Sequence, residues 1–124
     1  MSCFVRIATK IVDEIALREA IAERGYRITD SRQVRGYAGD EAADIVIDTG
    51  REYDIGASRS SDGTFTFVAD WEMARIDRDE FVGKLTQAYG VARVGHAAKK
   101  AGFVIAGKRV DENGSVKMTL RRFA

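Results

Sequence analysis

The 124-residue sequence contains no proline and only one cysteine, one histidine and one tryptophan. With Cys3 as the single cysteine, an intrachain disulfide is excluded. With His96 as the single histidine, one chain cannot assemble a zinc site of the cysteine and histidine type. A serine–histidine–aspartate triad would need His96, and no nucleophile-elbow motif is present to complete it. These absences argue against an enzyme without excluding one.

The sequence also lacks long apolar runs. No segment approaches the roughly 20 apolar residues that span a bilayer. The N-terminus has none of the charged, apolar and small-residue regions of a signal peptide, which predicts a cytoplasmic protein. No motif implies a cofactor. The length is that of one domain, so we expect residues 1–124 to form a single α+β domain.

The apolar residues that are present alternate as in β-strands over several segments, separated by glycine, asparagine, aspartate and serine. These segments are residues 2–10, 26–29, 33–37, 43–48, 52–59, 64–70, 103–110 and 115–122. Two helices are predicted, one over 13–24 and one from Asp77 toward Gly102, where Asp77 and Glu80 have capping-box spacing. The pattern predicts an α+β fold with a mixed or antiparallel sheet and two helices on one face.

Two segments repeat the same order of features. Residues 22–28 and 98–105 both contain the end of a helix, then glycine, an aromatic residue and a strand. This similarity raises the hypothesis of duplicated βαββ units, although the α+β prediction does not depend on it.

Five strings stand in a distinctive order along the chain. They are Gln33–Tyr37 (QVRGY), Ala43–Ile47 (ADIVI), Tyr53–Gly56 (YDIG), Val68–Trp71 (VADW) and Phe81–Tyr89 (FVGKLTQAY). In this order and spacing, and over nearly its whole length, the chain resembles the family of unknown function typified by chloroplast hypothetical reading frame thirty-five. The chain departs from the expected pattern at Ala57-Ser58 and at Glu72–Ala74. The family offers no established catalytic residues to carry over.

The resemblance implies a general role and no specific chemical reaction. It implies a non-catalytic accessory, assembly or adaptor protein that binds a protein partner. The partner that the resemblance implies is an AAA-type ATPase or, in phototrophs, a photosynthetic complex.

Residues Arg35, Gly36 and Tyr37 form the most suggestive local string for partner binding. A glycine between a guanidinium and a phenol would let a partner approach the backbone closely. The alternative is a bent strand with Tyr37 in the core.

Asp54, Asp70 and Trp71 complete the predicted partner-binding set. Asp70 and Trp71 stand at the end of a predicted strand, where Trp71 would either anchor an interface or pack in the core. An aspartate at a strand end is most often part of a turn, which is the alternative for Asp70.

Other polar residues receive structural interpretations. Asp44, Asp48 and Asp54 do not have the spacing of a calcium loop, so we predict no metal site. We expect His96 to be a structural residue on the helix flank and Cys3 to be a small buried residue of the first strand.

Charge is unevenly distributed, although the formal net charge is only +1. Residues 40–54 contain six acids and one base, whereas residues 99–124 contain seven bases and two acids. Either the surface is polarised and attracts a charged partner, or the two segments lie side by side and neutralise each other.

The basic C-terminal segment suggests the alternative function, a nucleic-acid-binding sheet protein. Its candidate phosphate-binding residues are Lys108, Arg109, Lys117, Arg121 and Arg122. Against this, only Phe103 and Phe123 could stack on bases, and the isoelectric point of about 7.9 is low for such a domain.

The sequence therefore supports three hypotheses: a protein-binding adaptor, a nucleic-acid-binding sheet protein, and a small enzyme. The enzyme would require Asp70, Arg35 and Tyr37 to meet around a cleft. A free sheet edge would also allow a two-fold homodimer.

Overall fold

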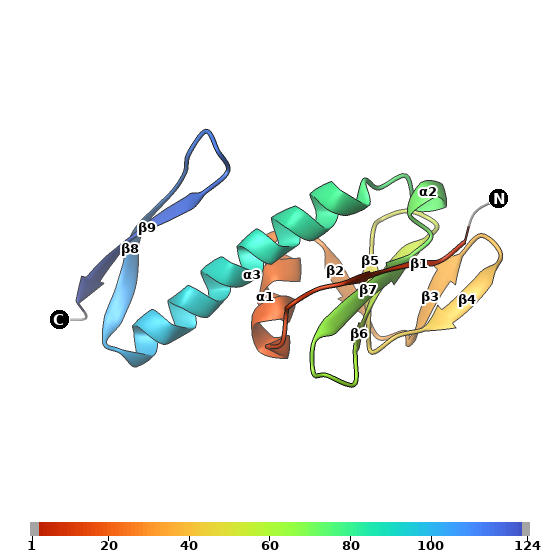
Figure 1. Cartoon of the computed structure of the whole chain (residues 1–124), viewed down its shortest axis with the longest axis horizontal. Coiled ribbons are helices and arrows are strands. Elements are labelled where there is room, and N and C mark those ends of the chain that lie inside the picture. The colour runs from red at the N-terminus through yellow and green to blue at the C-terminus, as the bar shows by residue number, and fades with distance from the viewer. Residues whose placement is uncertain (1–2, 123–124) are drawn as a thin grey trace.

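The computed structural model describes residues 3–122, which form nine strands and three helices (Figure 1). In chain order these are β1 (Val5–Ala8), α1 (Glu14–Glu23), β2 (Arg27–Thr29), β3 (Gln33–Gly36), β4 (Gly39–Ala42), β5 (Ile45–Asp48), β6 (Asp54–Arg59), β7 (Phe65–Ala69), α2 (Trp71–Ala74), α3 (Arg78–Lys100), β8 (Phe103–Val110) and β9 (Val116–Arg122). Every predicted strand and both predicted helices are present, whereas β4 and α2 were not predicted. Ser2, at the start of the predicted first strand, and Phe123, one of the two residues predicted to stack on bases, lie outside the described residues.

Five strands form the main sheet in the order β1-β7-β6-β5-β2, and all neighbouring pairs are antiparallel. Helices α1 and α3 cover one face of this sheet (Figure 1). The predicted α+β class, with an antiparallel sheet and these two helices on one face, is therefore confirmed.

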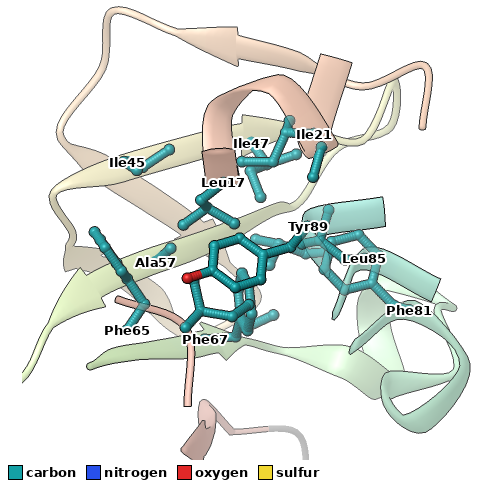
Figure 2. Close-up of a cluster of buried hydrophobic side chains, with 14 of the residues drawn as sticks. Leu17, Ile21, Ile45, Ile47, Ala57, Phe65, Phe67, Phe81, Leu85 and Tyr89 are labelled. Carbon is teal, nitrogen blue, oxygen red and sulfur yellow. The ribbon is translucent and has the colours of Figure 1, made fainter. Parts of the chain in front are cut away.

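The core fills the space between that face and the two helices. Figure 2 shows Leu17 and Ile21 of α1 meeting Leu85 of α3 above Phe65 and Phe67 of β7. All five side chains have a relative exposure of at most 1%. Burial of this apolar area is the main stabilising contribution to the fold.

An aspartate caps the start of each long helix, and at α3 half of the predicted capping box forms, because the carboxylate of Glu80 pairs with Lys84 at 2.9 Å and not with the start of the helix. The side chain of Asp13 accepts a hydrogen bond from the backbone N–H of Ala16 at 3.0 Å, and Asp77 accepts one from Glu80 at 3.0 Å. Gly25 follows α1 with a φ of +84°, a conformation that favours glycine. No helix within residues 3–122 combines the length and apolar character needed to cross a membrane.

The hairpin β3–β4 covers the opposite face of the sheet and has its own small core. Val34 of the hairpin is fully buried against Val46 and Val68 of the sheet. Gly56 of β6 permits this contact, because a Cβ atom there would lie 2.4 Å from Cγ2 of Val34. The close approach of the hairpin to the sheet therefore depends on a residue without a side chain.

The C-terminal hairpin β8–β9 forms a separate two-stranded sheet at the far end of α3 from the β3–β4 hairpin (Figure 1). In the first predicted βαββ unit, β2 returns to the main sheet, whereas in the second unit β8 pairs only with β9. The two units therefore differ in topology, and the structure gives no support to the hypothesis of duplication.

Candidate functional site

Four of the predicted partner-binding residues meet where β3 crosses the main sheet. Asp54 begins β6 and Asp70 directly follows β7, and the pairing of Ile55 with Ala69 places these two aspartates opposite each other. Arg35 and Tyr37 approach them from the β3–β4 hairpin. We call Arg35, Tyr37, Asp54 and Asp70 the anchor cluster.

Within residues 3–122, every hydrogen bond to the side chain of Asp54 comes from Arg35. Its Oδ2 accepts hydrogen bonds from the backbone N–H of Arg35 at 3.0 Å and from Nε at 2.8 Å, and its Oδ1 accepts one from Nη2 at 2.8 Å. Asp54 is only 3% exposed, so this two-pronged pair compensates the cost of burying its charge. The hydrogen bonds to Asp54 raise the pKa of Arg35 against the opposing effect of partial burial.

Asp70 has the turn-forming role that the sequence left open as an alternative. It is 2% exposed, and its Oδ1 accepts a hydrogen bond from the backbone N–H of Met73 at 3.4 Å, which caps α2. Its Oδ2 accepts one from the backbone N–H of Tyr37 at 3.3 Å. Asp70 therefore joins the start of α2 to the end of β3.

Trp71 packs in the core of the chain. Strand β7 ends at Ala69, so Trp71 begins α2 and does not end a strand as predicted. It is 6% exposed, packs against Phe81 with ring centroids 5.8 Å apart, and donates its indole N–H to the carbonyl of Val5 at 3.0 Å. The core alternative for this residue is therefore correct.

Gly36 and Tyr37 differ in their surroundings. A Cβ atom at Gly36 would lie 2.5 Å from Cζ of Phe4, so this glycine serves internal packing. The side chain of Tyr37 is 65% exposed, and the alternative that placed it in the core is wrong. Tyr37 lies at the turn of the hairpin and leaves the sheet.

The enzyme hypothesis required Arg35, Tyr37 and Asp70 to meet around a cleft, but Asp70 binds only the backbone N–H of Tyr37, and the guanidinium of Arg35 binds Asp54. These contacts fix β3 to the sheet. The neighbouring depression, of about 510 Å³, is lined by residues 51–53 and 72–75 and not by these three. The anchor cluster thus explains the fold of the hairpin, and it offers no cleft in which a substrate would touch all three groups.

The remaining single-residue predictions have mixed outcomes. Cys3 is exposed, so its predicted burial is wrong, because the chain joins the sheet only at Val5. His96 lies on α3 and contacts the carboxylate of Glu19 at 2.8 Å, as a structural residue would. Among residues 3–122, no group of three or more histidine, cysteine, aspartate or glutamate side chains is placed to hold a metal ion.

Half of the six acids in segment 40–54 pair with arginines from other strands. Glu41 pairs with Arg6, Asp48 with Arg27 at 2.9 Å, and Asp54 with Arg35 at 2.8 Å. For Asp48, the N–H of Gly50 and then the guanidinium of Arg27 lower the pKa of the carboxyl. The arginines of these pairs come from β1, β2 and β3, outside segment 40–54. A count of charges along the sequence cannot show such pairs, because their members are far apart in the chain.

The basic C-terminal hairpin lies at the opposite end of the molecule (Figure 1). Within residues 3–122, no ion pair involves any of its lysines or arginines. The alternative that segments 40–54 and 99–124 neutralise each other is therefore wrong, and the charge of the hairpin is available to a partner.

The pairing register divides the hairpin into two chemically different faces. Arg109 lies opposite Lys117, and Val104 lies opposite Arg121, so these pairs share one side of the ribbon. We call Arg109, Lys117 and Arg121 the basic face. A bulge between Ile105 and Gly107 keeps this alternation in step on both halves of β8.

The other side of the ribbon is mainly apolar. We call it the apolar face; it comprises Phe103, Ile105, Val110, Val116, Met118 and Leu120, with two bases, Lys108 and Arg122, among them. Val110 is 60% exposed, Leu120 44% and Ile105 37%. Together with α1 and α3, part of this face lines a groove of about 370 Å³. A groove edge with this much exposed apolar surface is typical of protein-binding surfaces.

Comparison with known proteins agrees with the resemblance found in the sequence. Residues 20–119 match the family described as "Protein of unknown function (DUF1257)". The chain is 30% identical over 128 aligned residues to "Uncharacterized protein ycf35" of Guillardia theta, covering 99% of this chain and 98% of that protein. No solved structure matches.

Proposed function

Because this chain belongs to the DUF1257 family, whose function is unknown, its own geometry must indicate its role, and we propose that it is a non-catalytic adaptor that binds an acidic protein partner. The observation that supports the proposal is the contrast between its two charged ends. Three of the six acids of segment 40–54 (Glu41, Asp48 and Asp54) pair with arginines of the chain, whereas no base of the β8–β9 hairpin has an acidic partner among residues 3–122.

The form of the hairpin supports the same proposal. A two-stranded ribbon is marginally stable by itself in water. Here both strands are largely exposed, and the apolar face presents Val110 and Leu120 to solvent. A partner that covers the ribbon would bury this apolar surface and pair its charges. Electrostatic attraction between the basic hairpin and an acidic partner would also accelerate their association.

Nucleic acid is the alternative partner for the same basic residues. A platform for single strands would place aromatic rings beside the bases on the exposed side. The described part of the hairpin has one aromatic residue, Phe103, which pairs with Arg122 and stacks under its guanidinium at 5.2 Å. By the register, Phe103 lies on the side opposite Arg109, Lys117 and Arg121. This arrangement favours protein over nucleic acid.

The test is affinity purification of the tagged protein from its native cells, with nuclease treatment and identification of both proteins and nucleic acid. An AAA-type ATPase and components of photosynthetic complexes are the partners to look for first. The comparison variant reverses the basic face: Arg109→Glu, Lys117→Glu and Arg121→Glu. We expect this variant to lose the partner that the wild type retains.

A matched control reverses three exposed bases elsewhere: Lys10→Glu, Arg32→Glu and Arg78→Glu. It carries the same change in net charge, so it should retain the partner if the hairpin is the site. The purified partner must then bind the purified protein directly, with an affinity that falls as salt concentration rises. Equal loss in both variants, or recovery of nucleic acid without protein, would contradict the proposal.

A further inference from the structure

Strand β9 has a free edge along its whole length. Within residues 3–122, the only strand that pairs with β9 is β8, so the backbone N–H and C=O groups on the other side of β9 have no strand partner. Proteins generally cover or charge such an edge, because it is a template for another strand. Strand β9 is regular over seven residues, Val116–Arg122.

The edge of β8 is a poorer template. The bulge between Ile105 and Gly107 interrupts its ladder, and a bulge locally disrupts strand pairing. Strand β8 also follows directly from α3 through Gly102, which places it nearer to the helix. Of the two edges of the ribbon, the edge of β9 is therefore the one on which another strand can pair without interruption.

Side chains of β9 alternate strictly between the two faces. Lys117 and Arg121 lie on the basic face with Thr119 between them, and Met118 and Leu120 lie on the apolar face. A strand added beside β9 would alternate in the same way. Its residues on the basic side would meet Lys117 and Arg121. Its residues on the other side would meet Val116, Met118 and Leu120, and only at the strand end Arg122, whose guanidinium lies over the ring of Phe103.

We propose that the edge of β9 binds an extended segment of the partner protein in which acidic and apolar residues alternate. Main-chain hydrogen bonds would supply affinity, and the two faces of the ribbon would select the alternating sequence. This inference rests on the proposed function, because it specifies the conformation and the sequence pattern of the acidic partner.

The same charges argue against a second copy of this chain as the occupant. Two β9 strands related by a two-fold axis normal to the ribbon would place their basic faces on the same side. Lys117 and Arg121 of one copy would then face the same residues of the other, and like charges opposite each other destabilise strand pairing. The edge is thus protected from self-pairing by the residues that attract an acidic strand.

The experiment uses the full chain and three labelled synthetic peptides of about eight residues, roughly the length of one strand. One alternates valine and glutamate, the second has the same composition in two blocks, and the third alternates valine and lysine. Fluorescence anisotropy measures affinity, and hydrogen exchange measures protection of backbone amides in β9. We expect the alternating acidic peptide to bind at least about tenfold more tightly than the others and to protect the amides of residues 116–122.

Two further measurements separate strand pairing from charge attraction. The variant Lys117→Glu with Arg121→Glu should prefer the valine–lysine peptide, and its circular dichroism reports whether it remains folded. The alternating acidic peptide with an N-methyl group on every amide keeps its side chains but loses the backbone donors of both edges, so it should not bind.

Each contrary outcome has its own meaning. Equal binding of the alternating and block acidic peptides would overturn strand pairing and leave the acidic-partner proposal standing. Absence of binding by both acidic peptides would overturn strand pairing, and the affinity purification described above would decide the proposed function independently.

Discussion

The carboxylate of Asp54 accepts three hydrogen bonds from the single residue Arg35, at 2.8–3.0 Å. One comes from the backbone and two from the guanidinium, so the contact fixes both the position and the charge of β3. Asp54 is nearly fully buried, while the side chain of Arg35 is 52% exposed. Loss of the aspartate would therefore free a guanidinium that water can solvate.

We expect Asp54→Asn to lower the free energy of unfolding by about 1–2 kcal/mol. Hydrogen bonds to charged groups contribute about 1.5–3 kcal/mol, and the partial exposure of Arg35 reduces this contribution. Urea denaturation measures the change. The control is Asp48→Asn, because Asp48 pairs with Arg27, whose side chain is 80% exposed, and we expect no resolvable loss there. Equal losses in the two variants would contradict the special role of Asp54.

Glycine 56 offers a second test of how the β3–β4 hairpin is attached. A Cβ atom there would meet Val34 at 2.4 Å, Ala43 at 2.8 Å and Val68 at 3.0 Å. We expect Gly56→Ala to destabilise the protein by about 1–3 kcal/mol, the usual cost of overpacking. Thermal denaturation of the purified variant measures it.

The matched control for this substitution is Gly83→Ala. Gly83 lies inside α3, and a Cβ atom added there would have no neighbour within 4 Å. Because alanine favours a helix over glycine, this variant should gain about 0.5–1 kcal/mol. The two glycine substitutions should therefore shift the melting temperature in opposite directions. If Gly56→Ala also raised the melting temperature, the close contacts around position 56 would not oppose a side chain there.

The sequence predicted those elements whose signals are local. Alternation of apolar residues located the long strands, and Asp13 and Asp77 located the starts of the helices. Strand β4 was missed because Gly39–Ala42 has no apolar alternation and is a strand only through its pairing with β3. Helix α2 was missed because its four residues carry no helical periodicity.

The candidate site was harder to predict because its contacts join distant parts of the chain. The sequence selected Arg35, Tyr37, Asp54 and Asp70, but it could not show that the two aspartates bind β3 internally. The pair of Arg35 with Asp54 spans 19 positions, and Tyr37 with Asp70 spans 33. Only the register of β6 and β7 brings these aspartates together. Composition therefore identified the charged segments and not their partners.

Tyr89 gives a prediction about pH. Its phenol oxygen accepts hydrogen bonds from the backbone N–H groups of Val12 and Asp13, both at 3.1 Å, and from the guanidinium of Arg93 at 3.2 Å. Burial of the phenol opposes ionisation, but the three donors outweigh it and lower the pKa of Tyr89. The phenol thus holds the segment that leads into α1.

Because the pKa of Tyr89 is lower in the folded protein than in the unfolded chain, folding favours the ionised phenol. The free energy of unfolding should therefore gain a contribution as pH rises from the folded-state pKa toward the unfolded value of about 10. This contribution is lost as pH falls through the folded-state pKa. Absorbance of tyrosinate should show the ionisation of Tyr89 below the unfolded value.

The control for this prediction is Tyr89→Phe. At neutral pH it should lose about 1 kcal/mol, since the two N–H groups at the start of α1 lose their acceptor and part of that loss is recovered from water. It should also lack the early tyrosinate signal and its share of the stability gain at high pH. An early signal that persists in this variant would assign the perturbed ionisation to another tyrosine.

The C-terminal hairpin should open more readily than the sheet. Neither β8 nor β9 contributes a residue to the main core cluster of the described chain, and most of their side chains are exposed. Local opening free energies are lowest where few apolar contacts are buried. We expect the amides of β8 and β9 to exchange with solvent faster than those of β5, β6 and β7, as hydrogen exchange with mass spectrometry can measure.

A chain truncated after Gly102 tests the same independence directly. It keeps α3 and every residue of the main core cluster, so its circular dichroism should retain cooperative thermal unfolding. If the truncated chain unfolds at all temperatures, the hairpin is part of the cooperative core and its exposure has another explanation. If it remains folded but no longer retains the partner in affinity purification, the hairpin is a binding element carried by a stable domain. Its low local stability would then be the reason that a partner strand can order it on binding.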